Sequence, residues 1–176
     1  MLAGGAWVDL HPAWMAGADP LFERLLLDVP WRTERRRMYD RTVDVPRMTA
    51  FYDADAPLPD ASLEVARRTL SRRYGPFATV GMALYRTGDD SVAWHGDTIG
   101  RGSTEDVVVA ILSLGFPRSL LLRPRGGGRA LRFDLAGGDL LVMGGSCQRS
   151  WEHSVPKTKR PVGPRMSVQF RPRNVA

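Results

Sequence analysis

Three residues with metal-binding side chains are spaced so that they could converge on one point. His95 and Asp97 are separated by Gly96, and on an extended segment residues i and i+2 point to the same side. His153 lies on a later segment with strand character and can supply a third ligand. Two histidines and a carboxylate occupy one face of an iron(II) ion and leave positions open for oxygen and a chelating co-substrate. We therefore predict a metal site at His95, Asp97 and His153.

Two arginines on one predicted strand could hold an acidic co-substrate. Arg165 and Arg171 flank a segment in which Met166, Val168 and Phe170 alternate with polar residues, so both arginines face the same side of a strand. A guanidinium binds a carboxylate through two parallel hydrogen bonds. The spacing therefore permits a dicarboxylate to bind inside a barrel. The alternative is an edge strand with two solvated arginines, and the alternation with apolar residues favours the first interpretation.

Helices are predicted in the first half of the chain and strands in the second. One helix is expected over Pro20–Leu27 with Asp19 as its cap, and another from after Asp60 to Tyr74. From Phe77 onward, short segments rich in β-branched and apolar residues alternate with turn signals, at 77–85, 107–114, 119–123, 130–134, 139–143, 151–155 and 166–171. Seven or eight strands with hairpin-length connections indicate a β-sandwich or barrel preceded by helices, a mostly β fold with flanking helices (α+β).

Composition and charge narrow the class of protein. The 176 residues, 43% of them hydrophobic, are sufficient for one domain with a buried core. The single Cys147 excludes an internal disulfide and a cysteine-only zinc site. The net charge of +6 comes almost wholly from arginine, because Lys157 and Lys159 are the only lysines among 25 basic residues. Arginine suits phosphate and carboxylate, so nucleic acid is a plausible partner, although solvated surface charge would give the same composition.

No membrane segment is expected. The longest apolar stretch, Val107–Phe116, is interrupted by Ser113 and is too short to cross a bilayer, and the N-terminus lacks a basic region followed by an apolar core. We expect a cytoplasmic protein without membrane association.

Several segments together resemble one known family, the AlkB-type 2-oxoglutarate dioxygenases that repair alkylated nucleic acid. The resemblance runs from about Trp31 to Pro172. The segments that carry it are Val45-Pro46-Arg47-Met48-Thr49-Ala50-Phe51-Tyr52, Leu84-Tyr85-Arg86, Asp90-Ser91-Val92-Ala93-Trp94-His95-Gly96-Asp97, Ser113-Leu114-Gly115, Gly138-Asp139-Leu140-Leu141-Val142-Met143, Trp151-Glu152-His153 and the Arg165–Arg171 strand. Their order and spacing together are highly specific.

The resemblance implies a fold and roles for the site residues. It implies a double-stranded β-helix, or jelly roll, at 77–173, preceded at 1–76 by an extension with helices and a nucleotide-recognition lid. By this resemblance, His95, Asp97 and His153 bind iron(II). Arg165 pairs with the distal carboxylate of 2-oxoglutarate, assisted by the Tyr85 hydroxyl, and Arg171 lies near the keto-acid end.

The resemblance also implies a reaction and a substrate class. The reaction is oxidative removal of methyl groups from bases of the 1-methyladenine and 3-methylcytosine type in DNA or RNA, using O2 and releasing formaldehyde, succinate and CO2. Such a base cannot be reached inside a duplex, so single-stranded DNA is the favoured partner, with RNA possible. We expect a monomer, associated with the nucleoid if the source is bacterial. Tyr39, Trp94 and His95 are candidates to stack against the base, although core packing would also explain Tyr39 and Trp94. Arg35-Arg36-Arg37 precedes Tyr39 and Arg47 follows it, and these arginines either contact phosphate or form a solvated charged surface.

The chain departs from the family pattern at two positions. Ala83 stands where the family usually has asparagine, two residues before Tyr85, and this removes a hydrogen bond to the co-substrate. Ile99 stands where the family often has an acid, two residues after Asp97, which affects base discrimination.

Three other interpretations stay open. The iron site could act on methylated RNA, a protein side chain or a metabolite. The chain could be a catalytically silent module that binds nucleic acid with steep salt dependence. A zinc hydrolase can also use two histidines and an aspartate, but it gives no role to the paired arginines and lacks an evident general base.

Overall fold

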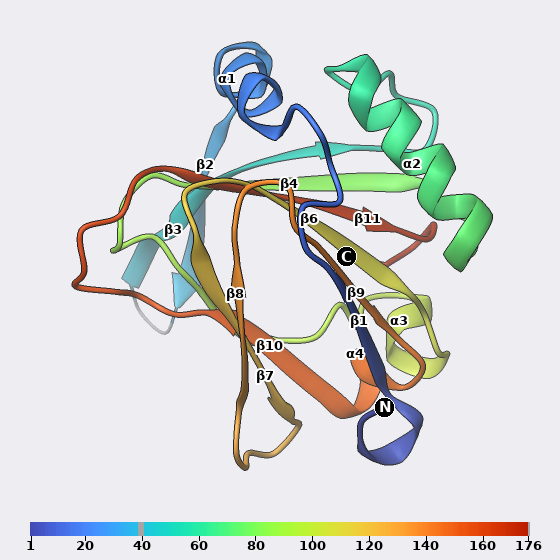
Figure 1. Cartoon of the computed structure of the whole chain (residues 1–176). Coiled ribbons are helices and arrows are strands. Elements are labelled where there is room, and N and C mark those ends of the chain that lie inside the picture. The colour runs from blue at the N-terminus through green and yellow to red at the C-terminus, as the bar shows by residue number, and fades with distance from the viewer. Residues whose placement is uncertain (39–40, 176) are drawn as a thin grey trace.

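Two antiparallel sheets that face each other form the body of the protein (Figure 1). The computed structural model describes residues 1–38 and 41–175, except for the side chains of 34–38 and 41–44. The larger sheet has the order β1-β9-β6-β11-β4-β3-β2 and the smaller sheet β5-β10-β7-β8. The strands are β1 Trp7–His11, β2 Arg32–Met38, β3 Arg41–Tyr52, β4 Thr79–Tyr85, β5 Val92–His95, β6 Val109–Gly115, β7 Arg118–Pro124, β8 Leu131–Leu135, β9 Leu140–Gly144, β10 Trp151–Val155 and β11 Arg165–Arg171.

The path of the chain from β4 to β11 confirms the jelly roll. β4, β6, β9 and β11 belong to the larger sheet, and β5, β7, β8 and β10 to the smaller one. All seven strands predicted after Phe77 are present, with ends shifted by one or two residues. Some of the connections are as short as predicted, for example those from β6 to β7 and from β8 to β9, but most do not form hairpins. β7 pairs with β8, whereas each of the other steps passes from one sheet to the other. Strands brought together in this way can surround a cavity.

The first part of the chain completes the larger sheet at both edges. β1 pairs with β9 at one edge, and β2 and β3 extend the other edge through the pairing of β3 with β4. The motif segment from Val45 to Tyr52 forms the second half of β3. The extension before Phe77 is therefore part of the same sheet as the jelly-roll strands.

Two helices cover the outer face of the larger sheet (Figure 1). α2, Ala61–Tyr74, begins where predicted, because the Asp60 carboxylate accepts a hydrogen bond from the N–H of Ser62 at 2.8 Å. α1, Ala18–Asp28, begins earlier than predicted. Its N-cap is Gly17 in the left-handed region (φ 71°), and the ladder of hydrogen bonds already starts at the Gly17 carbonyl. The prediction that Asp19 is the cap is therefore wrong, and Asp19 lies in the first turn.

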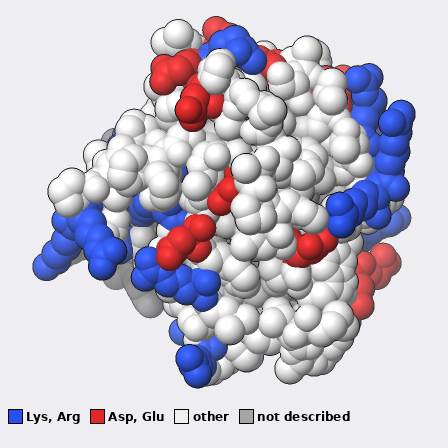
Figure 2. All heavy atoms as spheres, viewed as in Figure 1, with Lys and Arg blue, Asp and Glu red and all other residues white. Residues whose placement is uncertain are grey.

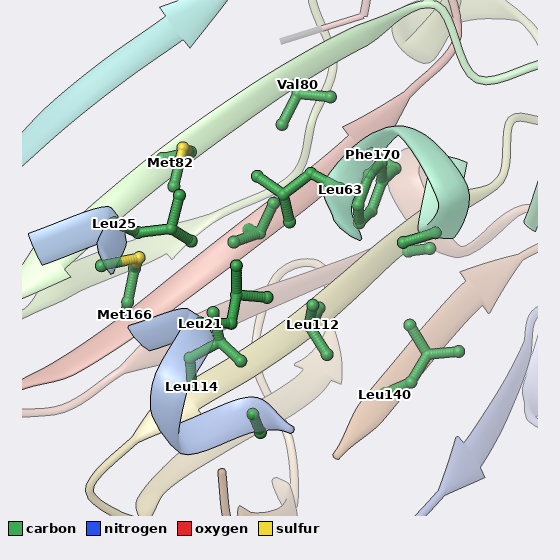
Figure 3. Close-up of a cluster of buried hydrophobic side chains, with 14 of the residues drawn as sticks. Leu21, Leu25, Leu63, Val80, Met82, Leu112, Leu114, Leu140, Met166 and Phe170 are labelled. Atoms are coloured by element: carbon green, nitrogen blue, oxygen red, sulfur yellow. The ribbon is translucent and has the colours of Figure 1, made fainter. Parts of the chain in front are cut away.

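The main core lies between these helices and the sheet. Figure 3 shows it in close-up, with labelled side chains Leu21, Leu25, Leu63, Val80, Met82, Leu112, Leu114, Leu140, Met166 and Phe170. Because side chains alternate along a strand, the other face of the sheet points to the smaller sheet. There a second apolar cluster, which includes Val109, Leu122 and Met143, fills one half of the interior. The other half holds the polar residues described below.

Three further helical segments are short. The segments are η1 Ala3–Gly5, α3 Arg101–Thr104 and α4 Cys147–Ser150. No helix among the described residues has the length and apolar character needed to cross a membrane. Figure 2 shows basic side chains in separate groups around the edge of one face of the molecule, one group at the position of α2, with uncharged surface and some acidic side chains between them. On this face the positive charge does not form one continuous stripe.

Candidate active site

The two histidines meet because β5 and β10 pair in the smaller sheet. His95 lies opposite His153, and their ring centroids are 4.3 Å apart. The register shifts between this pair and the pair of Val92 with Val155, which leaves one extra residue in β5. A bulge of this kind re-aims side chains. Val92 and His95 are three residues apart and nevertheless line the same cavity.

Asp97 follows β5 in a turn that α4 holds in place. Its backbone N–H donates to Oε1 of Gln148 at 3.0 Å. Gly96 makes this approach possible, because a Cβ at that position would lie 2.6 Å from the Gln148 carbonyl oxygen and 2.8 Å from Nη2 of Arg125. Arg125 in turn donates to the carbonyls of Gln148, at 3.3 Å, and Arg149, at 3.0 Å. The glycine between the two ligands is therefore needed for close packing.

These three residues fit a divalent metal ion. Ligand atoms of His95, Asp97 and His153 all lie within 4.8 Å of one another. Oδ2 of Asp97 is buried and has no hydrogen-bond partner among the described residues, as expected of an oxygen that binds a metal. Nδ1 of His95 lies 2.8 Å from the carbonyl oxygen of Ala93. A proton on Nδ1 leaves Nε2 available as a ligand.

The protonation states also suit a metal. Burial, followed by the nearby His95, lowers the pKa of His153 to about 3, so its imidazole is neutral near pH 7. Burial alone would raise the pKa of Asp97, but the charge of Arg171 is the largest of the effects that oppose burial, and the pKa is lowered. The site therefore offers neutral imidazole and a carboxylate, the donor set that iron(II) takes in two-histidine, one-carboxylate sites.

Arg165 is a buried cation whose terminal nitrogens lack partners. Its side chain is 1% exposed, and Nε donates to Oγ of Ser113 at 3.3 Å. Neither Nη1 nor Nη2 has a hydrogen-bond partner among the described residues. The guanidinium carbon lies 5.1 Å from the centroid of the Tyr85 ring. A buried charge without a partner is costly, so this arrangement fits an anionic ligand such as a carboxylate.

Arg171 is linked directly to the metal candidate. Its Nη2 donates to Oδ1 of Asp97 at 3.2 Å. Gly81 gives it space, because a Cβ there would lie 2.5 Å from Nη1 of Arg171 and 3.0 Å from Oε1 of Gln169. Arg171 therefore orients the carboxylate that faces the two histidines.

A cavity of about 640 Å³ between the sheets brings these residues together. The larger sheet contributes Thr49, Phe51, Gly81, Ala83, Tyr85, Ile111, Arg165, Ser167, Gln169 and Arg171, and the smaller sheet Val92, His95, Leu120, His153 and Val155. Five of the site residues predicted from the sequence line this cavity: Tyr85, His95, His153, Arg165 and Arg171. Asp97 reaches it through its contact with Arg171.

The predicted substrate contacts are placed less uniformly. Arg47 lines the cavity. Trp94 does not: its ring lies under the guanidinium of Arg123, at 4.0 Å, and Arg123 pairs with Glu152 at 2.6 Å on the outer face of the smaller sheet. Tyr39 lies outside the described residues, as do the side chains of 35–37. Of the two predicted substrate contacts that the structure describes, Arg47 lies at the cavity and Trp94 does not.

Several polar residues in or near the cavity were not predicted, among them Gln169, Gln148 and Arg118. Gln169 lies on the same face of β11 as the two arginines and donates to the Ser167 carbonyl at 3.2 Å, so the alternation in sequence could have identified it. Gln148 and Arg118 are buried through contacts with distant segments, and no local pattern marks them.

Ala83 leaves space beside Ser167, with which it is paired in register. Ile99 is 70% exposed and does not line the cavity.

Comparison with known proteins agrees with this geometry. Residues 16–171 match the family model of the 2OG-Fe(II) oxygenase superfamily. The human alpha-ketoglutarate-dependent dioxygenase alkB homolog 3 is 31% identical over 195 residues, covering 96% of this chain and 66% of the relative. The mouse DNA oxidative demethylase ALKBH2 is 28% identical, covering 89% of this chain and 75% of the relative. The chain spans just under two thirds of the length of the human homolog 3 protein.

Solved structures show the same fold at lower sequence identity. OsALKBH1 superposes with a TM-score of 0.65 at 15% identity, covering 98% of this chain and all of that one. A prolyl hydroxylase from Trichoplax adhaerens, in complex with a peptide of the hypoxia inducible factor oxygen degradation domain, gives a TM-score of 0.63 at 11% identity, covering 93% and 83%. The chain belongs to the 2OG-Fe(II) oxygenase superfamily, and its sequence relatives place it among the AlkB-type members.

Proposed function

We propose that this protein is an iron(II)- and 2-oxoglutarate-dependent oxygenase that removes N-alkyl groups from bases in nucleic acid. The observation that carries the proposal is the pairing, in one cavity, of the His95–Asp97–His153 ligand set with the unpaired guanidinium of Arg165. The substrate class is supported by the names of the relatives, which include a DNA oxidative demethylase. We further propose 1-methyladenine and 3-methylcytosine as the lesions, and single-stranded DNA as the favoured substrate.

In this proposal, separate residues of the cavity bind the metal, the co-substrate and the nucleic acid. His95, Asp97 and His153 hold iron(II), which, when bound together with 2-oxoglutarate, activates O2 for oxidation of the alkyl group. Arg165 binds the distal carboxylate of 2-oxoglutarate. Arg171 holds the carboxylate of Asp97 in position. In this proposal the cavity receives the alkylated base with its alkyl group near His95, Asp97 and His153, and Arg47 at the cavity wall contacts the nucleic acid.

The overall reaction balances without a further reductant. One oxygen atom of O2 enters the methyl group and the other enters succinate, while 2-oxoglutarate loses CO2. The N-hydroxymethyl product then releases formaldehyde and leaves the nitrogen of the base with a proton. Because the base edge is hidden inside a duplex, an unpaired base is the substrate that costs least to bring to the cavity.

A coupled product assay tests the proposal. The purified protein is incubated with iron(II), ascorbate, 2-oxoglutarate and a single-stranded DNA oligonucleotide carrying one 3-methylcytosine, with 1-methyladenine and RNA versions in parallel. We expect the demethylated base and succinate to form in equal amounts. If succinate forms without demethylation, the protein is an oxygenase with another substrate. If the oligonucleotide binds but no succinate forms, the protein is a binding module and the proposed enzyme activity is wrong.

A further inference from the structure

Arg118 is a second buried arginine at the Arg165 end of the cavity. It is the first residue of β7, is 5% exposed and shares the inward-facing side of the strand with Leu120 and Leu122. Its guanidinium carbon lies 5.8 Å from the centroid of the Tyr85 ring, and that of Arg165 lies 5.1 Å from the same centroid. Two guanidinium groups therefore contact one phenol ring.

The hydrogen bonds of Arg118 go to backbone carbonyls of two loops. Nη1 donates to Thr87 at 3.0 Å, and Nη2 donates to Asp90 at 3.0 Å and to Pro156 at 2.8 Å. Thr87 and Asp90 belong to the connection that follows Tyr85, and Pro156 to the connection between β10 and β11 that leads to Arg165. One side chain thus joins the segments on either side of this end of the cavity.

No carboxylate of the described residues pairs with the two buried guanidinium groups at this end of the cavity. Arg118 forms no ion pair among the described residues, and the nearby Asp90 carboxylate is paired with Arg86 at 2.8 Å. Within the described part of the chain, the side-chain hydrogen bond of Arg165 goes to the neutral Ser113. A planar guanidinium with several fixed hydrogen bonds is well suited to hold loops in one geometry.

We propose that Arg118 is a positioning residue for the co-substrate site. It holds Tyr85 and the two loops in place around Arg165, and adds its charge to the attraction of the distal carboxylate of 2-oxoglutarate. This inference rests on the proposed function, because it assumes that Arg165 binds that carboxylate. It assigns a role to a residue that does not itself line the cavity.

The test separates co-substrate binding from turnover. In Arg118→Met, we expect the KM for 2-oxoglutarate to rise about tenfold, with kcat within about threefold of wild type and the KM for the oligonucleotide unchanged. Arg118→Lys keeps the charge but loses the planar set of donors, so a rise of about threefold is expected. Arg132→Met is the matched control, because Arg132 is an exposed arginine of the same sheet that pairs with Asp134; all constants should stay at wild-type values.

Two further measurements make the result decisive. The dissociation constant of 2-oxoglutarate for the manganese(II)-loaded protein is measured by calorimetry without turnover, and thermal melting reports whether each variant is folded. A folded Arg118→Met or Arg118→Lys protein with wild-type affinity for 2-oxoglutarate, or with only kcat reduced, would overturn the inference. If Arg165→Ala also binds 2-oxoglutarate like wild type, the proposed co-substrate site itself is wrong.

Discussion

The two faces of β11 share one backbone but differ in chemistry. On the outer face, Met166 and Phe170 (Figure 3) and Val168 are fully buried in the core beneath the two helices. On the inner face, Arg165 and Arg171 line the cavity together with two other polar side chains. The side-chain period of two allows this separation. The burial of Met166, Val168 and Phe170 holds the strand in position, and the arginines at its two ends therefore face the cavity at a defined spacing.

The comparison predicts opposite consequences of mutation on the two faces. Burial of a large apolar side chain contributes roughly 1.5–3 kcal/mol to folding, whereas a buried guanidinium without an anion opposes folding. Changes on the outer face should lower stability and leave the activity of the folded fraction intact. Changes at the cavity should remove ligand binding or turnover and leave the fold intact.

The largest effect is expected at the metal site. Asp97→Ala removes the buried carboxylate that completes the ligand set, so turnover should fall by about 10³-fold or more. Circular dichroism and thermal melting should show a folded protein, and metal binding should be weakened in calorimetry. Turnover that persists in this variant would exclude Asp97 as a ligand.

The next effect lies on the outer face of β11. Phe170→Ala opens a cavity in the core and should lower the free energy of unfolding by about 3–5 kcal/mol, measured in urea. Phe116→Ala is the control, because Phe116 is 43% exposed and should cost about 1 kcal/mol or less. If the folded fraction of Phe170→Ala had lost most of its turnover, the two faces of β11 would not be separable in function.

Arg165→Ala should act on the inner face alone. We expect the KM for 2-oxoglutarate to rise by about 100-fold, while stability is unchanged or slightly higher because an unpaired buried charge is removed. Arg72→Ala, on the exposed side of α2, is the control and should behave like wild type. An unchanged 2-oxoglutarate requirement in Arg165→Ala would remove this residue from the site.

Gly81→Ala tests the inner face with the smallest change, the addition of one methyl group beside Arg171. The new Cβ would lie 2.5 Å from Nη1 of Arg171, so the guanidinium must move away from Asp97. We expect turnover to fall by about tenfold through misplacement of the carboxylate, with stability changed by about 1 kcal/mol or less because the tip of the arginine is flexible. Wild-type turnover in this variant would mean that the Arg171–Asp97 contact has no functional role.

Local patterns predicted seven of the eight jelly-roll strands and several of the cavity residues, and missed β5 as a strand. The alternation in β11 indicated Arg165 and Arg171, which line the cavity, and the spacing of His95 and Asp97 indicated two of the three residues whose ligand atoms lie together. In these segments the residue period matches the strand period, so local sequence and tertiary structure agree.

Features that depend on distant contacts could not be predicted. The bulge in β5 depends on its pairing with β10, and the strand character of β1 depends on its pairing with β9. Arg118 follows a pattern typical of a core position, and its hydrogen bonds involve loops far away in sequence. Trp94 is one candidate for stacking against a base by sequence, but the bulge and the pairing of the smaller sheet place it beside Arg123 instead.

A crystal structure of the protein with manganese(II) and 2-oxoglutarate, grown without oxygen, tests the central claim most directly. Anomalous scattering locates the metal independently of the ligand. The predicted result is one manganese ion bound by His95, Asp97 and His153, chelated by the keto acid, with the distal carboxylate hydrogen-bonded to Arg165. A metal bound elsewhere, or a 2-oxoglutarate carboxylate away from Arg165 while its guanidinium stays unpaired, would contradict the account.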